Sequence, residues 1–476
     1  MGASFTAGPF SQWPDGLGLA ALRDPDAVRE FARRARDEYR AVGIRMAPHP
    51  QVDLAGEPRW ARRLQTSGAD TDLVVAYTRA YLEGFQGTTL DSTSVACVTK
   101  HFPGAGAQLD GEDAHFPYGR EQVYPGGAFD EHLRPFVAAI EHDTAAIMPS
   151  YGMPVGPEID GVPIEEVGFG YNRQILTGLL RERLGYDGLI ITDWELVNDN
   201  LVAESRIDES ARRVLPVKFR LGLFDAPFVD EDAAETRRIA LEAQSRSVTV
   251  LKNSVVHGAP PLPLDRNARV YAEGVDRDAF ARAVTPAATP QEADLAIVRI
   301  DAPFESRGDL FLESYFHQGS LELPPGLVHR LRMIAQQAPL IVDVALDRPA
   351  ILTPLVDALA GLTVTFGVSD DALLDALTGR IAPRGRLPVE LPRSTCRRTP
   401  RIRCSLWDRG STSDDRFRAG FRTEGTGHDR RTFPRRRVAR PDDRAGEGRP
   451  TDVAHTDDAL RRAAPPRAWP PGTPPG

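Results

Sequence analysis

An α/β fold built on parallel strands is predicted for this chain. Helical and strand-like segments alternate through its first half, which is the pattern of β-α-β units. Each short apolar segment is also followed by a polar loop, and parallel strands place the loops that follow them at one end of a sheet. A second alternating pattern follows a linker-like stretch, so two α/β domains are expected within the 476 residues.

The elements of the first domain, residues 1–230, follow from the spacing of apolar side chains. Residues 1–24 contain Gly, Pro and Trp and are expected to form a loop. Apolar residues recur at helical spacing in four segments, residues 26–42, 71–85, 130–142 and 172–184. A short apolar strand follows each helix, at residues 44–47, 94–99, 145–148 and 189–192.

The fourth strand carries the first catalytic candidate. Leu189–Thr192 is a continuous apolar, mostly β-branched run, which is typical of a strand buried on both faces. Asp193 follows at once, and α/β barrels place their chemistry at the carboxyl ends of such strands. The alternative interpretation of Asp193 is a helix N-cap or a turn aspartate.

Polar residues follow the other strands in the same way. Lys100 and His101 come directly after the second strand, Ser150 follows the third, and Arg62 lies in the loop after the first. Lysine and histidine donate hydrogen bonds to hydroxyl groups, carboxylates accept them, and Trp194 offers an apolar face to a sugar ring. This rim would suit a ligand rich in hydroxyl groups, although the Lys-His pair by itself fits a solvated loop better.

Three motifs occur in one order and at matching spacing across much of the first domain. They are Lys100-His101-Phe102-Pro103-Gly104, Met148-Pro149-Ser150-Tyr151, and Gly185-Tyr186-Asp187-Gly188 leading to Thr192-Asp193-Trp194. Together they resemble glycoside hydrolase family 3, and within it the bacterial β-glucosidases. Arg59-Trp60-Ala61-Arg62 is similar to the family's Arg-Trp-Gly-Arg loop.

The resemblance implies a fold and a set of roles. The first domain would be a TIM-type (β/α) barrel, and Asp193 would be the catalytic nucleophile. Arg62 would contact a sugar hydroxyl and help keep Asp193 ionised, because a nearby cation lowers a carboxylate pKa. The substrate-binding residues would be Arg62, Lys100, His101, Ser150, Tyr151 and Trp194.

The second domain is expected at residues 265–394, after a linker at residues 231–264. Its predicted strands lie at residues 269–272, 295–300, 340–344 and 362–366, and its predicted helices at residues 326–336 and 351–359. Residues 232–252 form a helix that runs into a strand-like segment and resemble the family's bridge out of the barrel. The alternating pattern that follows resembles the family's α/β sandwich domain.

A glycosidase of this type needs a second carboxyl group. In many members of the family it comes from a loop of the sandwich domain. Glu305-Ser306-Arg307-Gly308-Asp309 resembles such a loop, so Glu305 is the acid/base candidate and Glu313 the second choice. The alternative is a solvated loop glutamate with no catalytic role.

Three departures from the family pattern bear on the fold. Members of the family carry a sugar-binding aspartate ahead of the region that residues 10–19 resemble. That aspartate has no counterpart here. Few residues separate Glu195 from the exit helix, where the family has a further helix and strand. With four strands instead of eight, an incomplete TIM-type barrel with exposed strand edges is expected. Residues 395–476 are dense in Arg, Pro, Asp and Gly and are expected to be disordered.

Composition excludes several other classes of protein. The net charge of −9 gives no reason to expect nucleic acid as a partner. The three cysteines fit neither a disulfide framework nor a zinc site, and no metal or cofactor is expected. No apolar run is long enough to span a membrane and no signal peptide is visible, so a cytoplasmic setting is expected. The oligomeric state is left open.

The predicted function is that of a retaining, exo-acting glycoside hydrolase that releases β-linked glucose from β-glucosides or oligosaccharides. One alternative is a β-N-acetylhexosaminidase, because Asp113-Ala114-His115 after the Lys-His motif resembles the signature of that subgroup. Ala105 stands where that subgroup has a second histidine, which counts against it. The other alternative is a catalytically inactive, sugar-binding remnant, because the barrel is incomplete.

Overall fold

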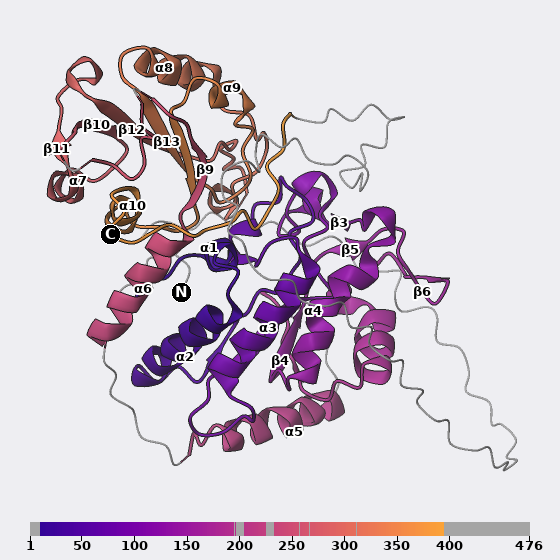
Figure 1. Ribbon diagram of the computed structural model, residues 1–476. Coiled ribbons are helices and arrows are strands. Elements are labelled where there is room, and N and C mark those ends of the chain that lie inside the picture. The colour runs from indigo at the N-terminus through magenta and orange to yellow at the C-terminus, as the bar shows by residue number, and fades with distance from the viewer. Residues whose placement is uncertain are drawn as a thin grey trace, which may run out of the picture. The chain divides into compact units, whose positions relative to one another are not determined.

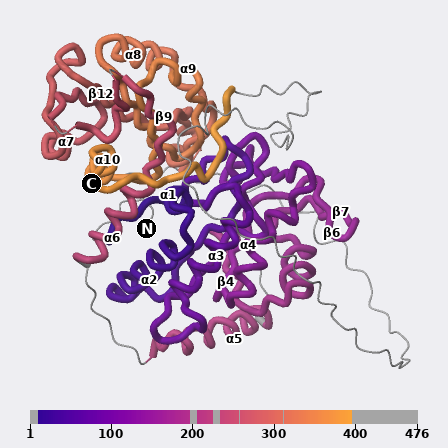
Figure 2. Tube along the Cα trace, viewed as in Figure 1, coloured from indigo at the N-terminus to yellow at the C-terminus, as the bar shows by residue number. Residues whose placement is uncertain are grey.

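The computed structural model of this protein describes 10–194, 196, 204–224, 233–256, 258–265, 267–310 and 312–394. These residues belong to one unit of the chain, residues 1–420 (Figures 1 and 2). The second unit, residues 421–476, lies outside the described residues, as does the whole segment 395–476 for which disorder was predicted. Among the described helices, none has the length and apolar character that a membrane span requires.

The first domain is built on one sheet of four parallel strands. In spatial order they are β1 (Met46–Ala47), β2 (Ala96–Phe102), β4 (Ala146–Pro149) and β8 (Leu189–Ile190). The helices that precede them are α2 (Pro25–Ala41), α3 (Thr71–Gln86), α4 (Phe129–Glu141) and the π-helical η6 (Gln174–Arg183). Within the described residues β1 and β8 are the two edges of this sheet, so the barrel is open. The predicted α/β fold with an incomplete barrel is confirmed.

Helix α2 shows why these helices form where the spacing predicts. The Asp24 carboxylate accepts hydrogen bonds from the backbone at the first turn, and Pro25 occupies a first-turn position that needs no hydrogen bond. Phe31 and Ala32 are buried on the side that faces α3. Gly84 of α3 lies so close to Ala32 that a side chain there would collide with it. Burying a side chain as large as Phe31 contributes about 1.5–3 kcal/mol.

The inner face of the sheet is covered by a helix. Successive residues of β2 alternate, so Cys97 packs among the outer helices while Ala96 and Val98 face inward. The inward residues pack with Val217 and Leu221, at the carboxyl end of α5 (Glu204–Arg220) and just beyond it. This helix therefore occupies part of the face that opposing strands cover in a closed barrel.

The second domain holds a six-stranded sheet between two helical layers. Its strand order is β11 (Thr285–Pro286), β10 (Arg269–Glu273), β12 (Leu295–Asp301), β13 (Leu340–Ala345), β14 (Gly361–Thr365) and β9 (Thr249–Asn253). Only β9 is antiparallel to its neighbour. Helices α8 (Pro325–Ala335) and α9 (Thr353–Val356) cover one face, and α7 (Arg277–Ala283) and α10 (Asp370–Leu377) the other. This is the predicted α/β sandwich.

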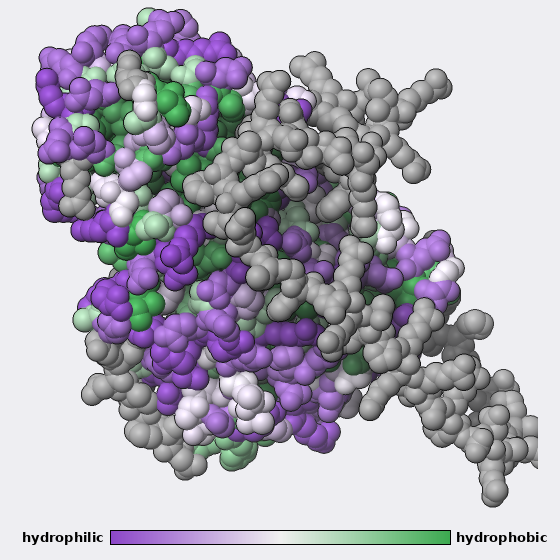
Figure 3. Space-filling view, viewed as in Figure 1, coloured by the Kyte–Doolittle hydropathy of each residue, from purple (hydrophilic) through white to green (hydrophobic). Residues whose placement is uncertain are grey.

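Shorter elements lie in the connections. The strands are β3 (Glu121–Gln122), β5 (Met153–Pro154), β6 (Glu158–Ile159) and β7 (Val162–Pro163). The 3₁₀ turns are η1 (Arg63–Gln65), η2 (Leu109–Gly111), η3 (Pro117–Gly119), η4 (Pro125–Gly127), η5 (Phe169–Tyr171), η7 (Pro290–Glu292) and η8 (Glu313–Tyr315). Hydrophilic side chains cover most of the described surface in Figure 3, as expected when the apolar residues form the cores.

Two segments differ from their predicted structure because of tertiary packing. Residues 16–21 were expected to be a loop, but they form helix α1 (Gly16–Ala21), whose Leu17 and Ala21 pack into the core of the sandwich domain. The predicted linker, residues 231–264, contributes helix α6 (Ala233–Ser247) and the edge strand β9. The sandwich sheet therefore begins earlier in the chain than its sequence pattern indicated.

The strand before Asp193 is shorter and less buried than predicted. Leu189 is buried, Ile190 and Ile191 are partly exposed, and Thr192 is exposed. The physical reason is the open sheet, since β8 has a neighbour on one side only among the described residues. A similar shortening affects the helix expected at residues 351–359, of which only α9 is formed.

Candidate active site

The bend of strand β2 brings two charged or polar side chains toward the end of the sheet. Lys100 is paired with Met148 of β4, but the next pair joins Phe102 to Pro149, so His101 is an extra residue on β2. Such a bulge changes the direction of a side chain and is common beside active sites. The loop after β1 continues along β2, since the backbone N–H of Val52 donates to the Lys100 carbonyl.

Asp53 holds His101 in place. Its carboxylate accepts hydrogen bonds from the backbone N–H groups of His101 and Ala105, at 3.1 and 2.6 Å, and contacts His101 Nδ1 at 2.8 Å. Burial raises the pKa of Asp53 to about 6, and the two backbone bonds act in the opposite direction. Burial, reinforced by Arg62, keeps the pKa of His101 well below its usual value, so the ring is neutral.

The neighbours of His101 define its tautomer. Arg62 Nη2 lies 3.0 Å from His101 Nε2, and a guanidinium can only donate. Nε2 therefore accepts from Arg62, and Nδ1 carries the proton that is donated to Asp53. His101 thus presents an acceptor atom to the site, where the sequence had suggested a donor.

Asp193 lies beside this group. Its buried carboxylate has Oδ2 at 3.9 Å from His101 Nε2, and its Oδ1 accepts from the backbone N–H of Trp194 at 2.9 Å. Residues more than 90 positions apart in the chain thus meet at the strand ends, as parallel strands require. The structure brings Arg62, His101 and Asp193 together.

Lys100 adds a titratable cation to the same end of the sheet. Burial and the positive charge of Arg62 lower its pKa to about 8, while the charges of Asp193 and Asp53 act to raise it. Lys100 therefore changes its charge near neutral pH, which an exposed lysine does not do.

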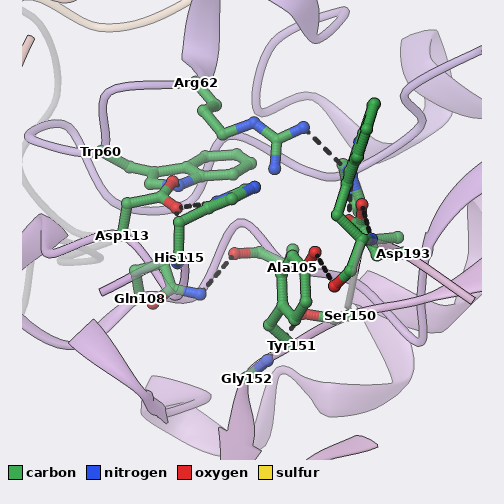
Figure 4. Close-up of polar contacts among 12 residues, drawn as sticks. Trp60, Arg62, Ala105, Gln108, Asp113, His115, Ser150, Tyr151, Gly152 and Asp193 are labelled. Carbon is green, nitrogen blue, oxygen red and sulfur yellow. Dashed lines mark hydrogen bonds and ion pairs between the residues drawn. The ribbon is translucent and has the colours of Figure 1, made fainter. Parts of the chain in front are cut away.

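A second aspartate–histidine pair, Asp113 and His115, lies across the site. Asp113 Oδ2 accepts from the indole of Trp60 at 2.7 Å, and Asp113 Oδ1 contacts His115 Nδ1 at 2.6 Å (Figure 4). Burial raises the pKa of Asp113, but the hydrogen bonds and charge of His115 and the charge of Arg62 together outweigh it and lower the pKa to about 2. The His115 ring also packs against Tyr151, at 4.9 Å between ring centroids.

Several of these side chains, but not those of Asp193 or Lys100, line a small cavity. Its lining residues are Trp60, Arg62, His101, Ala105, Gln108, Asp113, Ala114, His115, Ser150 and Tyr151. Of the predicted substrate-binding residues, Ser150 and Tyr151 thus join Arg62 and His101 in the wall. Trp194 does not line this cavity. Trp194 is 83% exposed to solvent, and its backbone carbonyl accepts a hydrogen bond from the Tyr151 hydroxyl at 2.6 Å.

Glu305 lies outside the lining of this cavity, in the loop after β12. Its side chain is 55% exposed, accepts from the Ser320 backbone N–H at 3.0 Å and lies 3.6 Å from Arg307. The backbone N–H of Glu305 donates to the Gln318 carbonyl, and Gln318 Oε1 accepts from the backbone N–H of Asp113. The Glu305 loop is therefore joined to the cavity wall through one residue, Gln318.

Glu313 is held in place by hydrogen bonds from its neighbours. It is buried and accepts hydrogen bonds from the Tyr118 hydroxyl at 2.5 Å and from the backbone N–H groups of Asp309 and Leu310. The bond from Tyr118 lowers the pKa of Glu313. A general acid must be protonated at the working pH, so this environment disfavours Glu313 in that role.

Sequence reasoning missed two residues that organise the site. Asp53 stands in the polar loop after the first strand, so the rule that placed Lys100 at the rim could have placed Asp53 there as well. Gln318 has no sequence signal, because it reaches the site from another domain. Among the described residues, no group of three or more His, Cys, Asp and Glu side chains is arranged to hold a metal ion.

Asp53→Ala is expected to destabilise the fold by about 3 kcal/mol, because it removes the acceptor of three buried hydrogen bonds and leaves His101 unpaired. Urea unfolding followed by circular dichroism would measure the change. Asp187→Ala is the matched control, since Asp187 is exposed and pairs only with Arg213 among the described residues. An Asp53→Ala protein as stable as the control would contradict this function of Asp53.

An open (β/α) sheet with a carboxylate and basic side chains at its strand ends, followed by an α/β sandwich, is the arrangement that the motifs predict for a glycoside hydrolase. The protein-family model described as "Glycosyl hydrolase family 3 N terminal domain" matches residues 2–216 of this chain. The chain is also 41% identical over 457 positions to β-glucosidase C of Emericella nidulans, covering 83% of this chain and 72% of that protein. The chain belongs to glycosyl hydrolase family 3.

Other similar proteins agree with this assignment. The periplasmic β-glucosidase/β-xylosidase of Dickeya chrysanthemi is 34% identical over 467 positions, covering 83% of this chain and 70% of that protein. A crystal structure of β-glucosidase from Listeria innocua in complex with isofagomine has the same fold, with a TM-score of 0.66 at 19% identity. The match covers 81% of this chain and 64% of that one. The relatives are fungal as well as bacterial, so the bacterial origin suggested by the motifs is not confirmed.

The alignment with β-glucosidase C also bears on the open barrel. It runs over 457 positions but covers only 83% of this 476-residue chain, so the relative has segments inside the aligned region that this chain lacks. The chain spans 72% of that relative and less than two thirds of the Listeria protein. The missing segments agree with the predicted internal deletion.

Proposed function

We propose that this chain hydrolyses terminal β-glucosides, releasing glucose from the non-reducing end with retention of configuration. The observation that carries the proposal is the buried Asp193 carboxylate 3.9 Å from His101 Nε2, with Arg62 donating to the same nitrogen. A carboxylate surrounded by hydrogen-bonding groups at the strand ends can attack an anomeric carbon while its neighbours bind the sugar hydroxyls.

Each site residue has a role in this proposal. Asp193 is the nucleophile, and Glu305 is the acid/base that protonates the leaving group. Lys100 and Arg62 donate hydrogen bonds to sugar hydroxyl groups, and His101 orients the Arg62 guanidinium by accepting from it through Nε2. Ser150 and Tyr151 contact the sugar from the cavity wall, and Trp194 stacks on a ring beyond it. The substrate is a β-glucoside or an oligosaccharide, and the expected cytoplasmic setting stays a prediction.

A specific observation favours one competing function. The close Asp113–His115 pair lines the cavity, and it is the feature that resembles the β-N-acetylhexosaminidase subgroup. A panel of nitrophenyl β-glucosides and nitrophenyl N-acetyl-β-glucosaminides would distinguish the two. Faster turnover of the glucosides supports the proposal, and faster turnover of the glucosaminides contradicts it. No turnover of either, with glucose binding retained, would indicate an inactive sugar-binding remnant.

The pKa of Lys100 gives this proposal a pH signature. Lys100 is charged below about pH 8 and neutral above it, and only the ammonium form carries the positive charge that strengthens its hydrogen bonds to sugar hydroxyls. We therefore expect kcat/KM for aryl glucosides to fall as the pH rises through about 8. In Lys100→Arg this alkaline limb should move to higher pH, because arginine stays protonated. An unchanged alkaline limb in Lys100→Arg would assign the titration to another group.

A further inference from the structure

Arg348 is a completely buried arginine in the loop that follows β13, with 0% of its surface exposed. Strands β12 and β13 are parallel neighbours, so the loops after them lie together at one edge of the sandwich sheet. Among the described residues, no carboxylate forms an ion pair with the Arg348 guanidinium. A buried cation is costly unless hydrogen bonds satisfy it, so the hydrogen-bond partners of Arg348 indicate what it does.

Those partners are four backbone carbonyls in three segments of the chain. Arg348 Nη1 donates to the carbonyls of Arg59 and Gly319, at 3.2 Å each. Arg348 Nη2 donates to the carbonyl of Pro303 at 2.5 Å and to that of Ser320 at 3.4 Å. Each terminal nitrogen thus joins two segments, and the planar guanidinium fixes how far apart the segments lie.

Two of these segments belong to the loop between β12 and α8, the acid/base loop, which carries Glu305. Pro303 stands two residues before Glu305. The Ser320 backbone N–H donates to the Glu305 carboxylate at 3.0 Å. Gly319 has a φ of +82°, and a Cβ at this position would collide with the Glu305 carboxyl group. The Glu305 side chain therefore lies on two residues whose carbonyls are both held by Arg348.

The third segment belongs to the wall of the cavity. Arg59 begins the loop that contains Trp60 and Arg62, which both line the cavity. The hydrogen bond from Arg348 to the Arg59 carbonyl therefore connects this wall to the acid/base loop. It is a second connection, in addition to the one through Gln318.

We propose that Arg348 is a positioning residue for the acid/base step. By binding the cavity wall and the acid/base loop together, it holds the Glu305 carboxyl group within reach of the leaving-group oxygen. This inference rests on the acid/base role proposed for Glu305. Proton transfer requires hydrogen-bond distance between the acid and the departing oxygen, and a displacement of about 1 Å can lower the rate about a hundredfold. Arg348 does not contact the sugar itself, because it is fully buried and does not line the cavity.

Arg348→Lys tests this role with the positive charge retained. Lysine has one nitrogen with three N–H groups, so it cannot bind four carbonyls in three segments. We expect kcat/KM for a β-linked glucose disaccharide to fall at least about tenfold, because this substrate needs a proton on the leaving oxygen. For dinitrophenyl β-glucoside, which needs little protonation, the loss should stay below about threefold. Equal losses on the two substrates would overturn the proposal.

Arg299→Lys is the matched control. Arg299 is a largely buried arginine of the same sheet, which pairs with Asp343 and Asp370 and donates to the Val368 carbonyl at 2.6 Å. These partners all lie in the sandwich domain and outside the acid/base loop. Arg299→Lys should lower the melting temperature without changing the ratio of the two kcat/KM values. A change in this ratio as large as that of Arg348→Lys would show that the ratio follows general destabilisation, and would contradict the positioning role.

A double variant separates a positioning role from a merely structural one. In Glu305→Ala no carboxyl group is left to position, so adding Arg348→Lys should lower kcat/KM for the disaccharide by less than about twofold further. Effects that multiply would show that Arg348 acts independently of Glu305, and would overturn this proposal alone. Failure of the acid/base role is a different result, since Glu305→Ala alone would then affect both substrate types equally. That result would overturn both proposals.

Gly319→Ala displaces Glu305 by a second route and carries the test if Arg348→Lys does not fold. The added Cβ should push the Glu305 carboxyl group out of its place and produce the same preference for the activated substrate. Circular dichroism and thermal melting would establish that each variant is folded. A folded Gly319→Ala chain with unchanged kcat/KM for both substrates would count against the proposal as directly as equal losses in Arg348→Lys.

Discussion

Asp193→Asn is expected to lower kcat for aryl β-glucosides by about a thousandfold or more, because the amide cannot form the covalent glycosyl-enzyme. Asparagine has nearly the same shape as aspartate. Its amide oxygen can still accept the hydrogen bond that the Trp194 backbone N–H donates to Asp193 in the wild-type protein. The fold and the affinity for glucose should therefore change little. Kinetics with nitrophenyl glucosides and calorimetric titration with glucose measure the two effects separately.

Asp187→Asn is the control for Asp193→Asn. Asp187 lies six residues earlier in the same stretch; it is exposed and forms an ion pair with Arg213. It should keep full activity. If Asp193→Asn also kept normal activity, the assignment of the nucleophile would be wrong. The retaining mechanism has its own test, since α-glucose as the first product in an NMR time course would exclude it.

The part of the site that could be predicted from the sequence is the part that depends on strand ends. Parallel strands expose their carboxyl-terminal loops at one end, so the positions of His101, Ser150 and Asp193 followed from finding the strands. The same rule could have identified Asp53, which follows the first strand and carries the hydrogen bonds that orient His101. The spacing of apolar residues likewise located helices such as α2 to within about one residue at each end.

The features that could not be predicted depend on packing between distant segments. Helix α1 has only six residues, too few for a periodic signal, and its Leu17 is buried in the core of the other domain. Helix α5 covers the inner face of the sheet in place of further strands, which are absent from the part of the chain that the structure describes. No local sequence pattern could indicate this packing. Gln318 belongs to the same class, since its contact with Asp113 joins residues 205 positions apart.

The surroundings of Glu305 explain why its role needs a kinetic test. A retaining site requires its second carboxyl group about 5–5.5 Å from the nucleophile, and partial burial would help to keep that group protonated. The side chain is instead 55% exposed and lies beside Arg307, which itself forms a two-pronged ion pair with Glu112. Its link to the cavity is the hydrogen-bonded chain from its own backbone through Gln318 to Asp113.

Glu305→Ala is expected to lower kcat/KM by about a hundredfold to ten-thousandfold for substrates with poor leaving groups, such as disaccharides, because these need a proton on the departing oxygen. Activated dinitrophenyl glucosides need little protonation and should lose less than about tenfold. Azide should restore turnover of the activated substrate, since it can attack the glycosyl-enzyme without help from a general base.

Glu313→Ala provides the comparison within the same loop. Because Glu313 accepts from Tyr118 and from two backbone N–H groups, its loss should lower the melting temperature and affect poor and activated substrates alike, without rescue by azide. Glu305 makes a single backbone contact through its carboxylate, so Glu305→Ala should leave the melting temperature nearly unchanged. An equal loss on both substrate types for Glu305→Ala would contradict the assignment. The acid/base role would then have to come from another group in the cavity wall, of which His115, already paired with Asp113, has the suitable chemistry.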